Sequence, residues 1–191
     1  MGASYGDLSD ETAYCKFLKT GDETLFKVLV ERHKNSLTLF LFGMVGNMED
    51  AEELMVDAFA IAASGTARYT VKKDSSFKTW LFAIARNKAR MLLRKRRVIF
   101  AELSEDIKSE TALPEPELFE KDDNKNLYEA LSEINPDYGQ VLYLTYFENM
   151  EPAEIARVLK KNKKQVYNLT VRGKEALKQA LERKGFDYAK Y

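Results

Sequence analysis

The sequence predicts an all-helical protein built from two small domains. Along most of the chain apolar residues recur at spacings of three and four, the period of an amphipathic helix, and no stretch alternates convincingly as a strand would. Only four prolines occur in 191 residues, so few helices are interrupted. An acidic, proline-containing stretch divides the chain. We therefore expect a helical unit over residues 8–97, a linker over residues 98–124 and a second helical unit over residues 125–184.

The first unit is expected to hold four helices, because polar caps and glycines bound its apolar stretches. Serine, aspartate and asparagine accept hydrogen bonds from the free N–H groups at a helix start, and glycine adopts the left-handed backbone that ends a helix. The expected caps and stops are Ser9, Gly21, Asp22, Asn47, Gly65 and either Ser75 or Ser76. They predict helices over residues 10–17, from 22 through at least 41, over 49–63 and over 77–97.

The third of these helices separates apolar and acidic residues onto opposite faces. The inward apolar face is predicted to carry Ala51, Leu54, Ala58, Phe59 and Ala62. The outer face is predicted to carry Asp50, Glu52, Glu53 and Asp57. Two explanations of the acidic face remain open at this point. It is either a docking surface for a partner or a set of carboxylates that only keep a surface helix soluble.

Cations concentrate on the fourth helix. Seven Lys and Arg residues and no acid lie between Arg86 and Arg97, and the aromatic residues Trp80 and Tyr69 are close by in the sequence. Cations beside aromatic rings suit phosphates and the stacking of unpaired bases, so this helix is a candidate site for single-stranded nucleic acid. The alternative is that Trp80 and Phe77 belong to the core, where large aromatic side chains are usually buried.

The second unit ends in a pattern typical of a helix-turn-helix. A short apolar helix from Pro152 to Leu159, a turn over residues 160–162 and a basic helix from Lys163 follow one another. Residues 155–174 contain seven cations and no acid. In such a motif the second helix enters the major groove of DNA. The residues expected to contact DNA are Lys160, Lys161, Lys163, Lys164, Gln165, Tyr167, Asn168 and Arg172. The alternative is an amphipathic hairpin with a solvated basic face.

The overall composition excludes several classes of site. The formal net charge is zero, which hides the two basic stretches and the nine acids within residues 101–123. One cysteine excludes an intrachain disulfide, and one cysteine with one histidine excludes the usual zinc clusters. We expect no catalytic residue, no metal and no cofactor. Without a visible leader or a long apolar stretch, we expect a cytoplasmic protein that does not insert into a membrane.

Three segments carry a resemblance to a known family. They are NMEDAEELMVDAF, then FKTWLFAIARN followed by RKRR, and finally EIARVLKKNKKQVYNLTVRGKEAL. In this order they resemble regions two and four of sigma factors of the extracytoplasmic-function (ECF) subfamily. The resemblance covers most of the chain outside the amino terminus and the acidic linker. It implies a sigma region 2 helical bundle and a sigma region 4 helix-turn-helix, in an alternative sigma factor that carries core RNA polymerase to promoter DNA and helps to open it.

The resemblance also implies a role for each motif. The acidic helix would bind the clamp coiled coil of the largest polymerase subunit through Asp50, Glu52, Glu53, Leu54, Asp57 and Phe59. The minus-ten element would be recognised and melted by Tyr69, Trp80, Asn87, Arg90, Arg94 and Arg97. The helix-turn-helix would read the minus-thirty-five element and lean against the polymerase flap. Family analogy alone suggests a membrane-bound anti-sigma factor as a further partner.

Four positions depart from the family pattern. Met91 stands where aspartate is frequent and Val56 where glutamine is frequent. Lys160 occupies a turn position that is often glycine, and Glu151 a position where serine or threonine commonly caps the helix. None of the four removes an apolar contact, so we expect the helices to pack as the family's do.

Two rival functions use the same residues differently. A polymerase-independent helix-turn-helix regulator would bind operators and use the first unit as a ligand or dimer module. A nucleic-acid enzyme would hold magnesium with Asp50, Glu52 and Glu53. Against the enzyme, no carboxylates from separate segments converge in a recognisable pattern.

Overall fold

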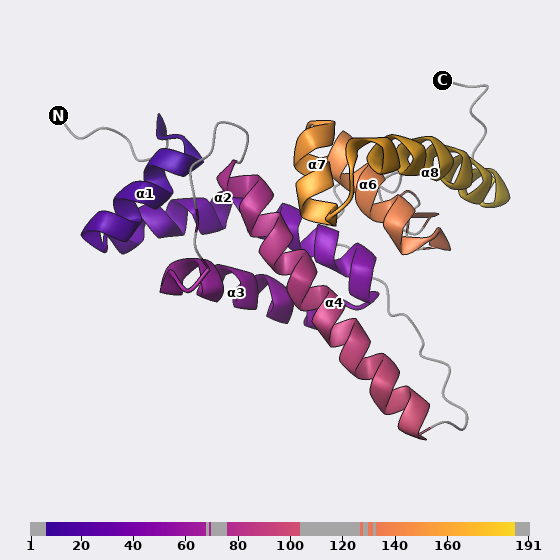
Figure 1. The fold of residues 1–191 in the computed structure, drawn as a ribbon, viewed down its shortest axis with the longest axis horizontal. Helices are drawn as coiled ribbons and strands as arrows, with labels where there is room; N and C mark the ends of the chain where they lie inside the picture. The colour runs from indigo at the N-terminus through magenta and orange to yellow at the C-terminus, as the bar shows by residue number, and fades with distance from the viewer. Residues whose placement is uncertain are drawn as a thin grey trace.

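The computed structural model describes residues 7–67, 69, 76–103, 127, 130–131 and 133–185 (Figure 1). Within these residues every regular element is a helix, and seven helices have defined bounds. The predicted all-helical fold class is therefore confirmed. Most of the predicted acidic linker, residues 104–126, lies outside the described residues, as does the loop segment 70–75.

The first three helices begin and end at residues that local chemistry selects. They are α1 (Asp10–Thr20), α2 (Glu23–Val45) and α3 (Met48–Ser64). A side-chain oxygen caps the start of each, from Ser9, Asp22 and Asn47. Each helix ends at a glycine with a positive φ, at Gly21, Gly46 and Gly65. A residue with a side chain rarely adopts this backbone, which explains why glycine ends all three helices.

Helix α4 (Phe77–Leu103) begins at a cap that two segments build. The hydroxyl of Ser76 accepts the N–H of Thr79 at 3.1 Å, and the carboxylate of Glu11 on α1 accepts the N–H of Phe77 at 3.0 Å. Two of the free donors at the helix start are thereby satisfied. The helix continues beyond Arg97, and Figure 1 shows its last turns extending away from the other helices.

The second unit contains α6 (Pro136–Tyr146), α7 (Pro152–Leu159) and α8 (Lys163–Arg183). Asn135 caps α6, and Pro136 takes its first position, where the missing N–H of proline costs nothing. Gly173 lets α8 approach α6 closely, because a Cβ atom there would lie 3.3 Å from Leu142 and Tyr138. These three helices therefore form one compact unit around α6.

The two units are packed against each other. Helix α7 lies on α4, and α6 lies on α2, and Figure 1 shows the second unit beside α4. Buried side chains from both units belong to one connected core that includes Phe40, Phe82 and Tyr143. The sequence predicted two units but gave no indication of how they sit relative to each other.

Candidate nucleic-acid and polymerase interfaces

Helices α7 and α8 form the predicted helix-turn-helix. Ile155, Leu159 and Val166 are buried and hold the two helices together. Lys160 ends α7 with φ 52° and ψ 47°, the left-handed conformation that glycine often supplies in this turn. Lysine therefore fits here, at an expected cost of about 1 kcal/mol.

The start of α8 is fixed by a reciprocal cap. Asn162 Oδ1 accepts the N–H of Gln165 at 2.8 Å, and Gln165 Oε1 accepts the N–H of Asn162 at 2.9 Å. This capping box sets the first turn of α8 in place. The side-chain oxygen of Gln165, a predicted DNA contact, is engaged in the cap, which leaves its amide NH₂ as the group free to contact DNA.

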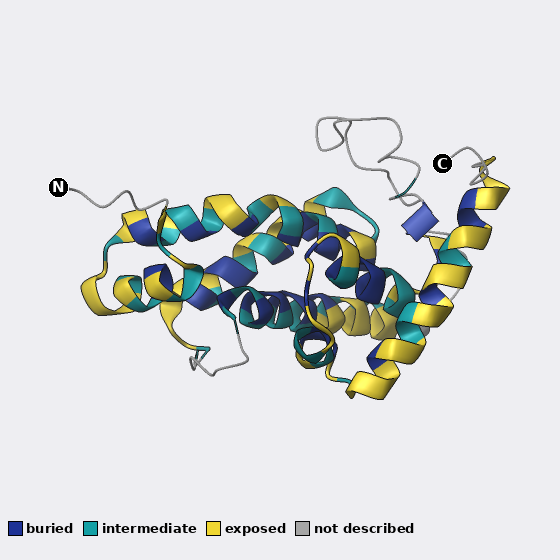
Figure 2. Ribbon diagram, turned by 90° about the horizontal axis from the view of Figure 1, so that it is seen from above, coloured by how far each residue is buried: buried dark blue, intermediate teal, exposed yellow. Residues whose placement is uncertain are grey.

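Most of the remaining predicted DNA contacts project from the first turns of α8. Lys163, Lys164, Tyr167 and Asn168 are exposed, and Tyr167 retains 70% of its accessible surface. Within the described part of the chain, neither lysine forms an ion pair. Figure 2 shows that most of the α8 surface is exposed. The cations at the start of this helix are therefore available to an external anion.

The other predicted cations of the helix-turn-helix differ in their surroundings. Lys160 and Arg172 are exposed, whereas Lys161 lies 3.0 Å from a carboxylate oxygen of Asp137 on α6. Lys161 would have to leave that partner in order to bind a phosphate.

The cations of α4 fall into two groups. Three of them contact other helices: Lys88 Nζ lies 2.7 Å from Asp57, Arg96 binds both oxygens of Asp50 at 2.5 and 2.7 Å, and Arg86 is buried. Arg90, Arg94, Lys95 and Arg97 are exposed, and Asn87 is half-buried. Two shallow grooves at the far end of α4 are both lined by Arg94 and apolar neighbours, one together with Arg97 and the other together with Lys95. The second group of cations, Arg90, Arg94, Lys95 and Arg97, therefore faces solvent.

The predicted stacking residues belong to an aromatic cluster under the start of α4. The ring of Trp80 lies 5.2 Å from that of Tyr69 and 5.3 Å from that of Tyr14, and Phe77 is fully buried. Burial, with nearby acids such as Glu11, raises the pKa of Tyr69 to about 12. Trp80 and Tyr69 are half-buried, so part of the cluster is accessible beside the start of α4.

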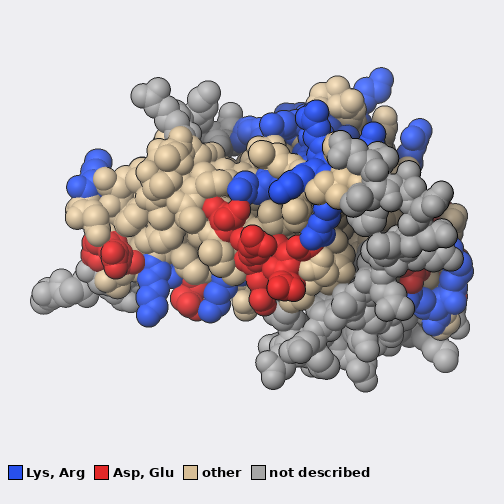
Figure 3. Space-filling view, turned by 90° about the horizontal axis from the view of Figure 1, so that it is seen from below, with Lys and Arg blue, Asp and Glu red and all other residues tan. Residues whose placement is uncertain are grey.

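The acidic face of α3 also divides into two parts. Glu52 and Glu53 are exposed, whereas Asp50 and Asp57 are held by cations of α4. Figure 3 shows acidic side chains gathered next to lysines and arginines on the face seen from below. Leu54 and Phe59, both assigned to polymerase binding by the resemblance, are 5% exposed and belong to the core. They can support this face only from beneath.

Asp50 is a structural residue of this face. Burial raises its pKa, but hydrogen bonds from Arg96 and Asn47 and the charge of Arg96 outweigh that effect, so the pKa of Asp50 is lowered. Its carboxylate thus stays ionised while it ties the start of α3 to α4.

No group of three or more His, Cys, Asp or Glu side chains in the described residues is placed to hold a metal ion. Among the helices that the structure describes, none has both the length and the apolar content that crossing a bilayer requires.

Sequence reasoning missed a set of polar residues between the two units. Glu154 of α7 accepts hydrogen bonds from Ser76 and Thr79, and Lys78 pairs with Glu148. A local capping contact explains only one of the two Glu154 oxygens, the one that accepts the N–H of Glu151. The contacts of Glu154 with Ser76 and Thr79 and of Lys78 with Glu148 join residues at least 70 positions apart, so no local pattern could have revealed them.

The sequence matches two family models in the predicted order. Residues 29–98 match sigma-70 region 2, and residues 124–177 match sigma-70 region 4. The first match covers most of α2, all of α3 and most of α4, and the second covers α6, α7 and most of α8.

Several relatives align over most of their length. ECF RNA polymerase sigma factor SigX of Bacillus subtilis (strain 168) is 25% identical over 167 residues, which cover 84% of this chain and 85% of the relative. SigW of the same organism is 25% identical over 87% of this chain and 94% of its own. RNA polymerase sigma factor CarQ of Myxococcus xanthus is 29% identical over 72% of this chain and 78% of its own.

Solved structures share the fold. CnrH, in complex with the cytosolic domain of CnrY, aligns with a TM-score of 0.64 at 24% identity, over 91% of this chain and 97% of that one. The sigma factor RpoE of Bartonella quintana, in complex with the anti-sigma factor NepR, aligns with a TM-score of 0.69 at 21% identity, over 82% of this chain and 96% of that one.

Proposed function

This chain belongs to the ECF group of sigma-70 factors, which direct transcription initiation by RNA polymerase without catalysing a reaction themselves, and we propose that its two cationic helices share the promoter between them. Helix α8 reads duplex DNA at the minus-thirty-five element. The outer face of α4 and the neighbouring aromatic rings hold the opened minus-ten element. The acidic face of α3 binds the clamp coiled coil of core polymerase, and the helix-turn-helix leans on the flap.

The main support for duplex binding by α8 is that its first turns are exposed. Lys163 and Lys164 are positioned by the cap at Asn162 and carry no ion pair within the described residues. Free cations at the start of a recognition helix bind phosphates, while Tyr167 and Asn168 are placed to reach base edges. Such an arrangement favours duplex DNA over single strands.

The outer face of α4 suits the opened strand. Arg90, Arg94 and Arg97 are exposed along one helix and offer charge to the backbone, while Trp80 and Tyr69 are half-buried beside its start. Binding of unstacked bases to such rings offsets a few kcal/mol per unstacked base. The half-buried rings would have to shift from their core contacts to stack on a base, which couples melting to a small rearrangement.

The carboxylates of α3 argue against the rival function, a magnesium-dependent nucleic-acid enzyme. Asp50 and Asp57 are engaged by Arg96 and Lys88, so within the described residues they do not converge with Glu52 and Glu53 on an open metal site. An experiment can distinguish the rival regulator from a sigma factor, because the regulator would bind its operator without retaining core polymerase.

Two further properties follow the family. We assign the protein to the cytoplasm, where core polymerase and the promoter are found. Because the related CnrH and RpoE structures are complexes with CnrY and with the anti-sigma factor NepR, we also assign an anti-sigma factor, anchored in a membrane, as its inhibitory partner.

The test is transcription by core polymerase with and without the purified chain, on fragments of the host genome. We expect promoter-dependent transcripts only when the chain is present. The double reversal Glu52→Lys and Glu53→Lys should abolish holoenzyme assembly, because it inverts the exposed acidic face. The matched control is Glu23→Lys with Glu31→Lys on α2, which makes the same change in net charge elsewhere. Unchanged assembly in the α3 variant would contradict the proposed docking face.

A further inference from the structure

Helix α1 lies outside the part of the chain that the region 2 model matches. That match begins at residue 29, on α2, whereas α1 covers Asp10–Thr20. None of the residues assigned above to DNA or polymerase lies on α1. Its buried face nevertheless contacts α4 and the aromatic cluster that the proposed function assigns to the opened minus-ten strand. Helix α1 can therefore act on promoter binding only through the residues that it holds in place.

Two side chains of α1 hold the two ends of the connection between α3 and α4, residues 65–76. Glu11 and Tyr14 are three residues apart, so they lie on the same face of the helix. The Tyr14 hydroxyl donates to the backbone oxygen of Ala62 at 2.8 Å, in the last turn of α3. The Glu11 carboxylate accepts the N–H of Phe77 at 3.0 Å, at the first residue of α4. One face of α1 therefore fixes where the connection leaves α3 and where it enters α4.

Both hydrogen bonds serve backbone groups at helix ends. The last four C=O groups and the first four N–H groups of a helix have no partner within the helix. The oxygen of Ala62 also accepts the N–H of Gly65, but at 3.4 Å, so the Tyr14 hydroxyl makes the shorter of these two bonds. Tyr14 is fully buried. Loss of its hydroxyl would therefore loosen the end of α3 at the point where the connection begins.

The ring of Tyr14 also supports the two aromatic residues assigned to the minus-ten element. Its centroid lies 5.4 Å from that of Tyr69, in an edge-to-face arrangement, and 5.3 Å from that of Trp80. The Tyr69 and Trp80 rings are 5.2 Å apart and half-buried. Aromatic pairs at these distances stabilise each other beyond the area that they bury. Because Tyr14 is fully buried, it supports both rings from the side that faces the core.

Helix α1 is itself fixed to α2 by a polar cluster. One oxygen of Asp10 accepts a hydrogen bond from Arg32 Nη1 at 2.6 Å, and the other lies 2.6 Å from His33 Nε2. Asp10 directly precedes Glu11, so this cluster anchors the turn of α1 that caps α4. The support for Tyr69 and Trp80 is therefore attached to the rest of the helical bundle.

We propose that Tyr14 and Glu11 are positioning residues for promoter melting, which hold Tyr69 and Trp80 close to the geometry in which unpaired bases stack, without touching DNA themselves. This inference rests on the proposed function, because it requires Tyr69 and Trp80 to bind the opened strand. Rings that are already held near their binding geometry lose less freedom when a base arrives, so they bind it more tightly. Because the two ends of the connection are fixed, the small shift that stacking requires stays local.

Binding of single-stranded DNA by the holoenzyme tests this role. The probe is a fluorescein-labelled oligonucleotide with the minus-ten sequence of a promoter found by transcription. Tyr14→Phe removes only the hydroxyl and should raise the Kd for the probe about fivefold, the factor expected for one hydrogen bond. Glu11→Ala should raise the Kd by about the same factor, because it removes a helix cap. Glu11→Gln should restore most of the affinity, since its amide oxygen can still accept the N–H of Phe77.

A merely structural role would affect other activities as well. Holoenzyme assembly and the binding of a duplex that carries only the minus-thirty-five element should therefore be unchanged in Tyr14→Phe and Glu11→Ala. Anisotropy with the labelled duplex measures the second of these. The melting temperature of each variant, followed by circular dichroism, shows that it is folded at the temperature of the binding measurements.

The position of the Trp80 ring can be followed in the free protein, because Trp80 is the only tryptophan of the chain. Tyr14→Leu removes the supporting ring. It should shift the Trp80 emission to longer wavelength and increase its quenching by acrylamide, because water then reaches more of the indole. If Tyr14→Leu does not fold, the isosteric Tyr14→Phe still decides the proposal through the oligonucleotide.

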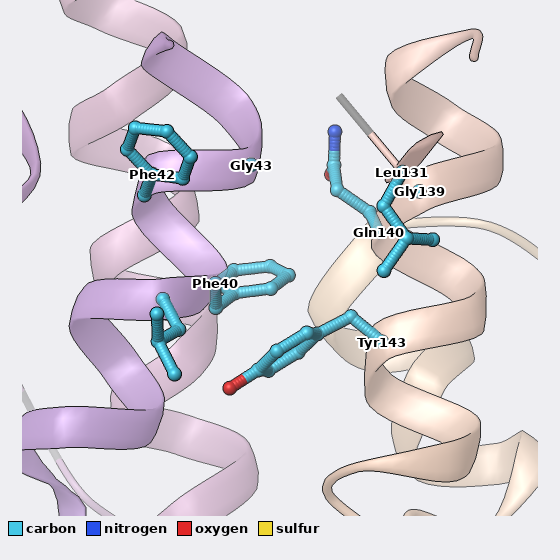
Figure 4. Close-up of a pocket in the computed structure, with 8 residues that line it drawn as sticks. Phe40, Phe42, Gly43, Leu131, Gly139, Gln140 and Tyr143 are labelled. Atoms are coloured by element: carbon cyan, nitrogen blue, oxygen red, sulfur yellow. The ribbon is translucent and has the colours of Figure 1, made fainter. Parts of the chain in front are cut away.

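The matched control is Tyr143→Phe, which makes the same chemical change on a different pair of helices. The Tyr143 hydroxyl on α6 donates to the backbone oxygen of Ser36 on α2 at 2.9 Å. Figure 4 shows its side chain reaching from α6 toward α2 beside Phe40. This control loses a hydrogen bond of the same kind, so it should leave both the affinity for the oligonucleotide and the Trp80 emission unchanged.

The outcomes are distinguishable. Unchanged or tighter oligonucleotide binding in both Tyr14→Phe and Glu11→Ala would overturn the positioning role, as would an equal loss of affinity for the oligonucleotide and the duplex. An equal loss in Tyr143→Phe would also overturn it. If the wild-type holoenzyme bound no minus-ten oligonucleotide, the proposed minus-ten site would fail, while the Trp80 emission would still decide whether Tyr14 positions that ring.

Discussion

Helices α4 and α8 carry the two cationic stretches of this sigma factor, and the structure uses them differently. At the start of α8, Lys163 and Lys164 face solvent with no ion pair among the described residues. On α4, Arg86, Lys88 and Arg96 are held by polar or acidic groups of other helices. The comparison teaches that a run of cations in a sequence combines two populations. One population joins helices, and only the other is available to nucleic acid.

The packing of each helix explains the difference. Helix α8 packs on α6 and α7, while Lys163 and Lys164 in its first turn are exposed. Helix α4 touches α1, α2, α3 and α7, so many of its polar side chains meet carboxylates on neighbouring helices. Cations on a central helix therefore tend to form ion pairs within the protein, whereas cations on a peripheral helix stay exposed.

The largest expected effect comes from removing the free cations of α8. Lys163→Ala with Lys164→Ala should weaken promoter binding across all sequences and lower the salt-dependence slope by about two units, one per lost phosphate contact. The melting temperature should not change, since both side chains are exposed. Filter binding or fluorescence anisotropy over a salt series measures the slope. Lys178→Ala, at the far end of α8, is the control, and an unchanged slope in the double variant would contradict the recognition role.

Asp50 and Glu53 sharpen the comparison on the acidic side. Asp50→Ala should lower the free energy of unfolding by about 2 kcal/mol, because it removes the charged hydrogen bonds to Arg96 and the link to the α3 cap. Glu53→Gln, on the exposed part of the same helix, should change stability by less than about 0.5 kcal/mol. Urea unfolding of both variants measures the difference. Equal stabilities would mean that Asp50 is as peripheral as Glu53.

A fall in pH should first weaken the ion pairs that join helices, because it protonates their carboxylates. The pKa of Asp50 is lowered by Arg96 and Asn47 against the effect of burial, and the pKa of Asp10 is lowered by His33 and Arg32 in the same way. A lowered folded pKa gives stability that is fully present above the unfolded value of about 3.8 and is lost as the pH falls through the folded value. Unfolding measured from pH 6 down to pH 2 should therefore show a loss below about pH 4. In Asp50→Asn that loss should be smaller.

The smallest effect is expected at the turn of the helix-turn-helix. Lys160→Gly should relieve the left-handed strain and raise stability by no more than about 1 kcal/mol, because glycine also costs entropy on folding. It should also lower the salt slope by about one unit if Lys160 contacts a phosphate. Lys160→Asn, which tolerates the same backbone, separates the two effects. A loss of stability in the glycine variant would show that the turn is not strained.

Much of the fold was predictable because its signals are local. Ser9, Asn47 and Asn162 cap the helices that the sequence indicated, and Gly21 and Gly65 end two of them. The helix-turn-helix appeared at the expected residues for the same reason. Each of these features depends on neighbours within about four positions, which a linear pattern records.

The candidate site was predictable only in part. Lys163, Lys164, Arg90 and Arg94 are exposed as cationic contacts should be. Lys161 and Gln165 were assigned to DNA as well, yet the structure engages Lys161 with Asp137 and the side-chain oxygen of Gln165 with the cap. Leu54 and Phe59 lie in the core. Residue type and spacing show which groups are able to bind a partner, whereas burial and intramolecular contacts determine which remain available.

The sequence by itself determined the helices, their caps, the order of the two sigma regions and the family. Tertiary structure alone decided that the regions close on each other and that Arg86 becomes a buried cation between them. The physical reason is the distance along the chain over which each feature arises. Caps and helical periods arise within a few residues, but the environment of Arg86 is made by Asp137 and Gln140, which approach it only when separate helices pack.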